Sequence, residues 1–376
     1  MTAKAKTKVR RLGLVLAFAA SACATFADVS TVVDLRVLAV ETDPSEVILT
    51  VTGLPTDPAV AVDPMALAIE PASIPTIHLT PLVVEPPSAA GRTLTYSLSA
   101  CPNNPYGAAP PMNMGGGGPD PSGGARTTVG STTCDGAPLA WAFGSNPTGI
   151  FDVTLTPEQL AYAFMHDIYL DQDLRFHGGF DLGLPINFQL TVDDGVETAV
   201  AIKRVLFWAQ KLPGQVANVP PAIPVIHTYA DRTAAWDPIA PIGTLDADTP
   251  AHVALGAGLW LEPILPPEDV ESYVTTVIDR DPPHLAVPIT VPRERLRYAF
   301  YATAGHFDPA RTVSELPPGV AGRVHLESHY LPPAKLDDVP VDATTSLHLV
   351  TVWIVVRDDR GGETWATGHL ALAPAP

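Results

Sequence analysis

Proline recurs so often along this chain that few stretches of it can form a long helix. The 376 residues include 41 prolines, and a proline inside a helix removes a backbone hydrogen bond and clashes with the preceding turn. Between the prolines, segments rich in Val, Thr and Leu alternate with turn residues, a pattern typical of β-strands. We therefore expect an all-β protein.

Two segments far apart in the chain share one strand-like register. They are "RTLTYSLSA", which begins at Arg92, and "ERLRYAFYATAG", which begins at Glu294. Apolar side chains recur at every second position in both, so each set should lie on one face of a strand. The matching sets are Leu94, Tyr96, Leu98 and Ala100, and Leu296, Tyr298, Phe300 and Ala302.

Each of these segments is followed later by a hairpin pattern. The stretches "INFQLTVDDGVETAVAIKRVLFW" and "HLVTVWIVVRDDRGGETWATGHLAL" both read as a strand, an acidic turn with glycine, and a second strand. In the second hairpin, residues 349–356 are apolar on nearly every position. This predicts a strand that is buried on both faces and central in its sheet.

The repeated pattern predicts two tandem Ig-like β-sandwich modules, residues 32–211 and 222–376, joined by a proline-rich linker at residues 212–221. The first module is the larger one, because it also carries an insertion and a helix. Thr156 should cap that helix, with Pro157 in its first turn and Gln159 completing a capping box. Apolar residues then follow at helical spacing, at Leu160, Ala163, Phe164 and Ile168.

Residues 1–22 have the features of a secretory signal. Five basic residues precede an apolar run that is too short to cross a bilayer, which takes about 20 residues. Cleavage before Cys23 would produce a lipoprotein with residues 23–31 as its tether, whereas cleavage after Ala27 would release a soluble secreted or periplasmic protein. Ala24, rather than Asp, follows Cys23, and the resemblance to lipoprotein signals of this kind implies the outer membrane.

Cysteine number favours the lipoprotein. The chain has 3 cysteines, so if Cys23 carries the lipid, Cys101 and Cys134 remain as a pair. In an oxidising compartment they should form a disulfide that closes the Gly/Pro-rich insertion 101–134. That insertion is interpreted either as a displayed binding loop or as a tolerated insertion that the disulfide holds out of the way.

Several of these segments together resemble a known group of proteins. They are "DLRVLAV", the cysteine pair after a Tyr-containing strand, "YAFYATAGHFD" and "VVRDDRGGETWA". The chain resembles predicted bacterial envelope lipoproteins with tandem Ig-like (PKD-like) modules. The resemblance implies an Ig-like fold and an envelope location, and it implies no assigned activity and no catalytic residue.

Two sets of residues could bind metal. His325, Glu327 and His329 recur at every second position, and two imidazoles with a carboxylate suit zinc or iron. Side chains two apart on a strand diverge by nearly 7 Å, however, so the alternative is a solvated polar face. Acidic residues could hold calcium, although their spacing does not match an EF-hand. One set is Asp167, Asp171 and Asp173, with Asp181, Asp193 and Asp194 in the same module. The other is the pair Asp358 and Asp359, whose alternative role is to form a turn.

The net charge and the absence of known catalytic motifs limit the classes of function that the chain can have. Without the five basic residues of the signal, 17 basic residues face 40 acidic ones, a net charge of −23, which excludes nucleic acid as a partner. The sequence lacks a G-x-S-x-G elbow, an H-E-x-x-H motif and a P-loop. Of the tryptophans, Trp208 and Trp353 are expected in the core and Trp236 at the surface.

We therefore expect a non-enzymatic lipoprotein, anchored in the outer membrane by its lipid alone and acting through surface interaction or envelope structure. Its partner would be a surface protein or a glycan, and it would need no cofactor. The alternatives are a metal-dependent hydrolase that uses His325, Glu327 and His329 with zinc, a protein that binds calcium, or a secreted carbohydrate-binding protein.

Overall fold

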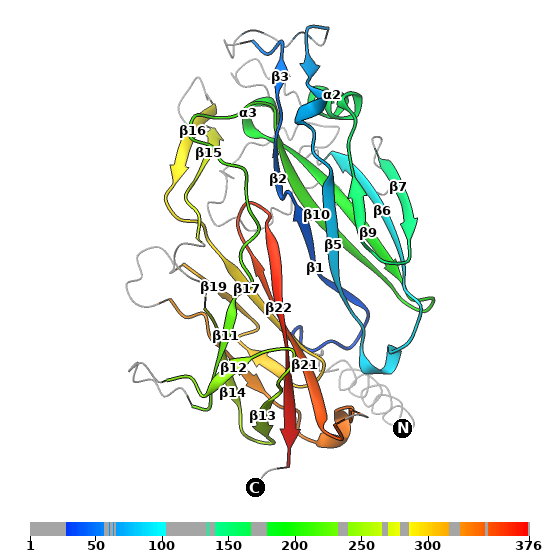
Figure 1. Cartoon of the computed structure of the whole chain (residues 1–376), viewed down its shortest axis with the longest axis vertical. Helices are drawn as coiled ribbons and strands as arrows, with labels where there is room; N and C mark the ends of the chain where they lie inside the picture. Colours follow the sequence, from blue (N-terminus) through cyan, green and yellow to red (C-terminus); the bar gives the residue numbers. More distant parts are fainter. Residues whose placement is uncertain are drawn as a thin grey trace, which may run out of the picture.

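The computed structural model describes residues 28–55, 60, 63, 65–102, 134, 140–166, 179–231, 240–264, 270–278, 286–315, 324–342 and 345–374. Strands dominate these residues (Figure 1), so the chain is mostly β, as predicted. The signal segment, Cys23, Asp167, Asp171, Asp173 and Trp236 lie outside the described residues. No helix in the described ranges has both the length and the apolar character needed to cross a membrane.

The first half of the chain forms two sheets, with the orders β1-β5-β8 and β2-β10-β9-β6-β7. β2 runs parallel to β10, and the other pairings in these sheets are antiparallel. The strands are β1 (Arg36–Asp43), β2 (Glu46–Ile48), β5 (Ile77–Val84), β6 (Thr95–Pro102), β7 (Trp141–Asn146), β8 (Phe151–Val153), β9 (Leu184–Asp193) and β10 (Thr198–Trp208). A short ribbon pairs β3 (Val51–Thr52) with β4 (Ala68–Ile69).

The second half forms sheets with the orders β12-β11-β14-β20-β18 and β13-β22-β21-β17-β19. Here β13 runs parallel to β22, as β2 does to β10. The strands are β11 (Val225–Tyr229), β12 (Gly243–Leu245), β13 (Ala251–Ala254), β14 (Leu259–Ile264), β17 (Arg297–Ala302), β18 (His306–Asp308), β19 (Arg311–Val313), β20 (Ser328–Leu331), β21 (His348–Arg357) and β22 (Glu363–Ala373). A separate hairpin joins β15 (Tyr273–Ile278) to β16 (Ala286–Val291).

The shared register predicted from the sequence is confirmed. β6 lies between β9 and β7, and β17 occupies the corresponding place between β21 and β19. The apolar faces of both strands point into the core of their own half. Of the eight matched side chains, seven are buried and Leu94 is half-buried.

Both predicted hairpins are also present, as β9–β10 and β21–β22. β21 is the middle strand of its sheet, as expected. One of its faces, which carries Val352 and Ile354, lies in the core of the second half. On the other face Val355 is buried but Trp353 is only half-buried, so Trp353 is not the core residue that we expected.

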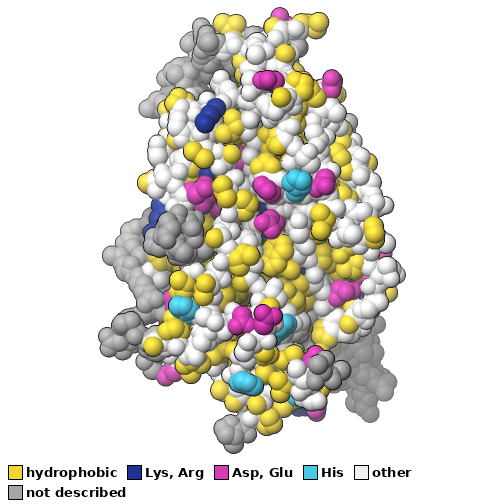
Figure 2. Space-filling model, in the orientation of Figure 1, with side chains coloured by type: hydrophobic (Ala, Val, Ile, Leu, Met, Phe, Trp, Pro, Cys, Tyr) yellow, Lys and Arg dark blue, Asp and Glu magenta, His cyan; other side chains and the backbone are white. Residues whose placement is uncertain are grey.

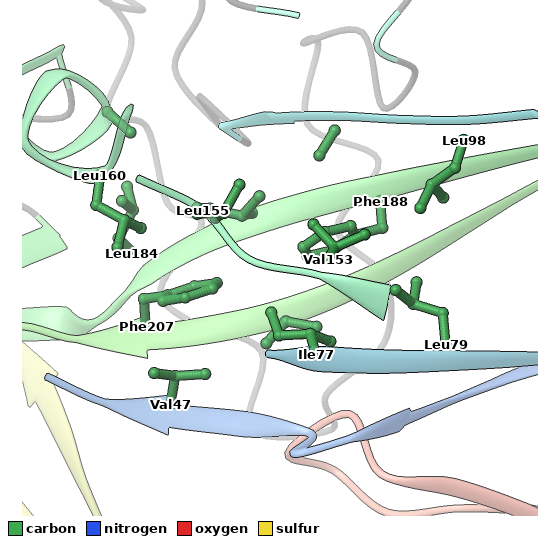
Figure 3. Packing of buried hydrophobic residues seen from close by; sticks show 14 of the residues in the cluster. Val47, Ile77, Leu79, Leu98, Val153, Leu155, Leu160, Leu184, Phe188 and Phe207 are labelled. Carbon is green, nitrogen blue, oxygen red and sulfur yellow. The ribbon is translucent and has the colours of Figure 1, made fainter. Parts of the chain in front are cut away.

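Each half buries its own apolar core. In the first half, Val47 from β2, Ile77 from β5, Phe188 from β9 and Phe207 from β10 converge between the two sheets (Figure 3). Burying a side chain of this size stabilises a fold by about 1.5 to 3 kcal/mol. Trp208, at the end of β10, is buried as predicted.

The predicted helix is α2 (Pro157–His166), and its capping box is confirmed. The backbone N–H of Gln159 donates to Thr156 Oγ1 over 3.2 Å, and the N–H of Thr156 donates to Gln159 Oε1 over 2.8 Å. Leu160, Ala163 and Phe164 are buried against the sheets, whereas Ile168 is outside the described residues.

The sequence did not predict α3 (Gly179–Leu182), whose four residues are too few to show a helical period. The described residues also include three single-turn 3-10 helices, η1 (Pro71–Ser73), η2 (Pro87–Ala89) and η4 (Leu336–Asp338).

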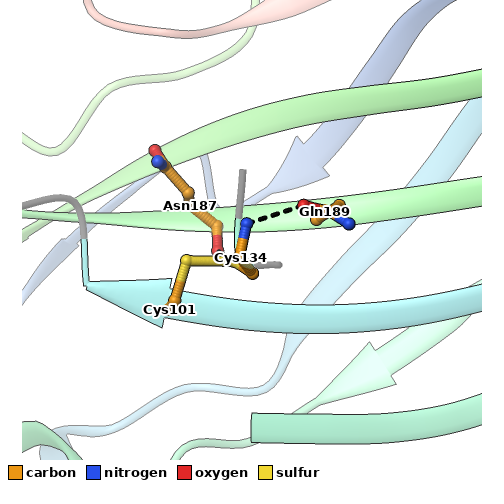
Figure 4. The surroundings of a disulfide bond; sticks show 4 residues. All are labelled: Cys101, Cys134, Asn187 and Gln189. Carbon is orange, nitrogen blue, oxygen red and sulfur yellow. Dashed lines mark hydrogen bonds between the residues drawn. A yellow bond between two sulfur atoms is a disulfide. The ribbon is translucent and has the colours of Figure 1, made fainter. Parts of the chain in front are cut away.

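The predicted disulfide joins Cys101, at the end of β6, to Cys134 (Figure 4). Both cysteines are buried, and the backbone N–H of Cys134 donates to Gln189 Oε1 of β9 over 2.7 Å. The ends of the insertion are therefore fixed to the sheet. The insertion itself, residues 103–133, is outside the described residues.

The two halves also pack on each other. Leu38, Ala39 and Val84 from the first half form an apolar cluster with Val355 from the second, and the half-buried Trp353, Trp365 and Tyr301 pack around it. At the start of the chain, residues 28–32 reach across to the second half. The N–H of Val32 donates to the Ala302 carbonyl, and the N–H of Ala302 donates to the Ser30 carbonyl. The N–H of Phe307 donates to Ser30 Oγ.

Candidate functional site

The structure brings two of the three predicted metal ligands together. His325 and Glu327 lie just before β20, with His325 Nδ1 2.9 Å from Glu327 Oε1. His329, inside β20, instead stacks on the indole of Trp260, with ring centroids 4.5 Å apart and an angle of 10° between the planes. Burial lowers the pKa of His329. Within the described ranges, no three His, Cys, Asp or Glu residues are arranged to hold a metal ion.

The acidic pair Asp193–Asp194 serves the turn between β9 and β10. Asp193 Oδ1 accepts the N–H of Gly195, and Asp194 Oδ1 accepts the N–H groups of Val196 and Glu197. Arg92 Nη1 also donates to Asp194 Oδ2 over 2.6 Å. These bonds, led by the backbone N–H of Glu197, lower the pKa of Asp194 to about 2, so the carboxylate stays ionised in its structural role.

The most developed polar cluster lies where the two halves meet. The turn between β21 and β22, residues 358–362, projects against the first half and the 212–221 segment. We call the polar residues around this turn the junction cluster; they are Glu46, Lys203, Asn218, Glu271, Tyr273, Glu294, Asp358, Asp359, Arg360 and Glu363. The sequence singled out only Asp358 and Asp359 among them.

Arg360 links both halves through its guanidinium group, which is only 5% exposed. Nη1 donates to Glu271 Oε2 over 2.9 Å, on the second half. Nη2 donates to Glu46 Oε2, on the first half, and to the Val216 carbonyl between them. The guanidinium carbon also lies 4.8 Å from the centre of the Tyr273 ring, a distance suited to a cation–π contact. Arg360 is thus the cation that the two halves share.

Glu46 is the acceptor on the first half. Its Oε1 accepts the indole N–H of Trp208 over 2.6 Å, and its Oε2 accepts the backbone N–H of Asn218 over 2.8 Å. With Arg360, three donors saturate a carboxylate that is buried at the start of β2. A buried carboxylate is stable only when it is paired in this way.

Asp358 organises the turn and faces the segment between the halves. Its Oδ1 accepts the N–H groups of Arg360 and Gly362, and its Oδ2 accepts Asn218 Nδ2 over 2.9 Å. Gly362 is required here, because a Cβ at this position would lie 2.1 Å from Asp358 Oδ2. Burial is the main cause that raises the pKa of Asp358, to about 6.

A second buried cation approaches the turn from β10. Lys203 is 2% exposed, its Nζ donates to the Gly361 carbonyl, and it lies 3.4 Å from Glu363 Oε1. Burial lowers its pKa. Glu363 also accepts the N–H of Val40, and Arg357 donates to the Leu38 carbonyl, so charged groups of β21 and β22 bond to the backbone of β1.

Glu294 is the exception in the junction cluster. It is 3% exposed, and its Oε1 accepts no hydrogen bond from the part of the chain that the structure describes. Burial first, and then the carboxylates of Asp358, Asp359 and Glu271, raise the pKa of Glu294 to about 8. At neutral pH this carboxyl is therefore mostly protonated.

Sequence reasoning missed most of this cluster because its members come from distant segments. One usable signal was Lys203, a charge inside the apolar run of β10, where a buried lysine requires a partner. The cluster joins the two halves of the molecule through ion pairs and hydrogen bonds.

Comparisons with known proteins add no relative to this picture. No protein-family model matches the chain, and no curated protein matches it. The functional argument therefore depends on the residues and their geometry.

Proposed function

We propose that the chain is a non-enzymatic lipoprotein of the bacterial outer membrane, built from two Ig-like β-sandwich modules and acting as a structural or binding element at the cell surface. The observation that carries this proposal is the repetition of one sheet order in both halves, joined by the junction cluster. Such a pair of modules supplies an extended surface for a protein or glycan partner.

The strand order supports the Ig-like assignment. In an Ig fold, strands A, B and E share one sheet, and strands C, F and G share the other. β1, β5 and β8 take the A, B and E places in the first half, and β6, β9 and β10 take C, F and G. β11, β14 and β20, and β17, β21 and β22, repeat this arrangement in the second half.

The start of the described chain defines how an anchored protein would sit. If Cys23 carries the lipid, the residues from Cys23 to Ser30 span at most ~25 Å when fully extended. Ser30 is bonded to Ala302 and Phe307 of the second half. A bilayer at Cys23 would therefore lie next to this corner of the second half.

Intact mass of the protein purified from membranes tests the anchor. We expect a chain that begins at Cys23, carries a diacylglyceryl group, and exposes two alkylatable thiols only after reduction. The Cys23→Ser variant should instead appear in the soluble fraction. A wild-type chain that begins at Asp28 and carries no lipid would contradict the anchored role.

Surface exposure needs a separate measurement, because a lipid anchor alone does not place the modules outside the cell. We expect protease added to intact cells to degrade the protein while a periplasmic marker survives. Protection of the protein until the outer membrane is permeabilised would contradict the cell-surface role and favour a periplasmic structural one.

A further inference from the structure

We propose that the junction cluster is a proton-controlled latch, in which a protonated Glu294 lets Arg360 hold the two halves together and loss of that proton loosens them. This inference concerns the contact between the halves and does not depend on the lipid anchor. It predicts that the strength of this contact changes with the pH of the surrounding medium.

Glu294 is placed to act on that contact. It precedes β17, its backbone N–H donates to the Glu271 carbonyl over 2.8 Å, and its side chain is buried within range of the charges of Asp358, Asp359 and Arg360 in the turn. One carboxylate oxygen has no donor within the described residues. The charged and titratable groups around it are Glu271, Tyr273, Asp358, Asp359 and Arg360.

The charges around Glu294 favour its neutral form. Arg360 already serves two carboxylates, Glu46 and Glu271, while Asp358 and Asp359 lie close by. A further buried negative charge would repel these groups and would compete with Glu46 for the guanidinium. Because the Arg360–Glu46 pair is one of two ionic links that the described residues form between the halves at this turn, beside Lys203–Glu363, that competition acts directly on the contact.

An ionised Glu294 is unfavourable in the closed junction, where it is buried. Opening of the junction lets water solvate the carboxylate and removes this cost. The Asn218 amide shows that the closed junction is not fully satisfied, since its Oδ1 also has no donor among the described residues. Ionisation of Glu294 therefore favours the open form, and protonation favours the closed form.

The linkage between proton binding and opening of the junction gives the direction of the pH dependence and the pH range in which it occurs. Burial raises the pKa of Glu294 to about 8 in the closed junction, from the ordinary value of 4.5 for an exposed glutamate. The closed form holds its proton more tightly, so opening becomes easier as pH rises from about 4.5 to about 8 and levels off above that. Between these limits the opening constant should rise up to about tenfold per pH unit.

Hydrogen exchange of the full mature protein can measure this opening. The informative amides are that of Val40, which bonds across the junction to Glu363, and that of Asn218, which bonds from the 212–221 segment to Glu46, the carboxylate that Arg360 pairs with. After correction for the intrinsic exchange rate, we expect their opening constants to rise between pH 6.5 and 8 and to flatten above pH 8. Amides in the centre of β21 should not follow this trend, which separates local opening from global unfolding.

The variants make the assignment specific. Glu294→Gln should abolish the rise, whereas Glu315→Gln, at an exposed carboxylate that pairs with Arg295, should behave as the wild type. Glu271→Gln offers a second route if Glu294→Gln does not fold. It removes a neighbouring carboxylate, so the plateau should begin at a lower pH than in the wild type.

Four results would overturn the latch. They are a flat profile in the wild type, an unchanged slope in Glu294→Gln, an equal change at the centre of β21, and loss of the wild-type slope in 1 mM CaCl2. The last result would assign the junction to a cation instead of a proton.

Discussion

Single side chains in this protein depend on close complementarity with their neighbours, and the half-buried His329 is the clearest case. Its imidazole lies flat against Trp260 and over Gly258, where a Cβ would come within 1.7 Å of His329 Nε2. Glycine is therefore needed here for space. The stack of two rings fixes β20 to β14 on the outer face of their sheet.

Substitution of Gly258 by Ala should therefore displace the His329 ring and lower the free energy of unfolding by about 1 to 3 kcal/mol. Urea denaturation measures this change. The double variant Gly258→Ala with His329→Ala should recover part of the loss, because the clashing ring is gone. Equal stability of the wild type and Gly258→Ala would contradict the close contact.

Glu46 is a second residue whose effect should exceed that of an ordinary surface carboxylate. Glu46→Gln weakens the acceptor for Trp208, Asn218 and Arg360 and leaves the guanidinium less well paired. We expect a loss of about 2 to 4 kcal/mol by urea denaturation. Glu70→Gln, at an exposed glutamate, is the matched control and should change stability by less than about 0.5 kcal/mol.

At the scale of elements, the disulfide joins β6 to Cys134, whose backbone N–H is bonded to Gln189 of β9. It closes a loop between residues 33 positions apart. The chain-entropy model credits such a loop with about 3 to 4 kcal/mol, because the cross-link restricts the unfolded chain.

Cys101→Ser with Cys134→Ser should therefore lower the free energy of unfolding by about 3 kcal/mol. The comparison is made by urea denaturation of the oxidised wild type and the double variant. Reduction of the wild type should give a similar loss. A double variant as stable as the oxidised protein would show that the disulfide does not stabilise the first half.

The elements that were predictable are those encoded by local patterns. Alternation identified β6 and β17, glycine-containing turns identified both hairpins, and the Thr156–Gln159 box identified α2. The metal hypothesis joined His325, Glu327 and His329 by spacing alone, and the fold instead turned His329 onto Trp260, a residue of another strand.

The junction cluster was largely beyond prediction for the same physical reason. Asp358 could be recognised as a turn residue, but Arg360 and its partner Glu46 are 314 positions apart in sequence. Their pairing results from the packing of two complete halves, so a short-range sequence pattern cannot predict it.

For the whole molecule, the junction decides whether the two halves unfold as one unit. Interfaces between modules are often small enough to permit independent motion. Here an apolar cluster, the Arg360 pairs and the residues 28–32 that cross to the second half all join them. We therefore expect a single cooperative transition by calorimetry at pH 6, where Glu294 is protonated and the junction is closed.

Arg360→Met should separate that transition into two. The substitution keeps an apolar stem of similar length, but it leaves the buried Glu46 and the half-buried Glu271 without their shared cation, which destabilises the contact between the halves more than either core. Arg311→Met, at an exposed arginine of β19, should keep one transition. Two transitions already in the wild type, or one unchanged transition in Arg360→Met, would mean that the halves are not coupled through the junction. In that case a change in Glu294 protonation could not be transmitted from one half to the other.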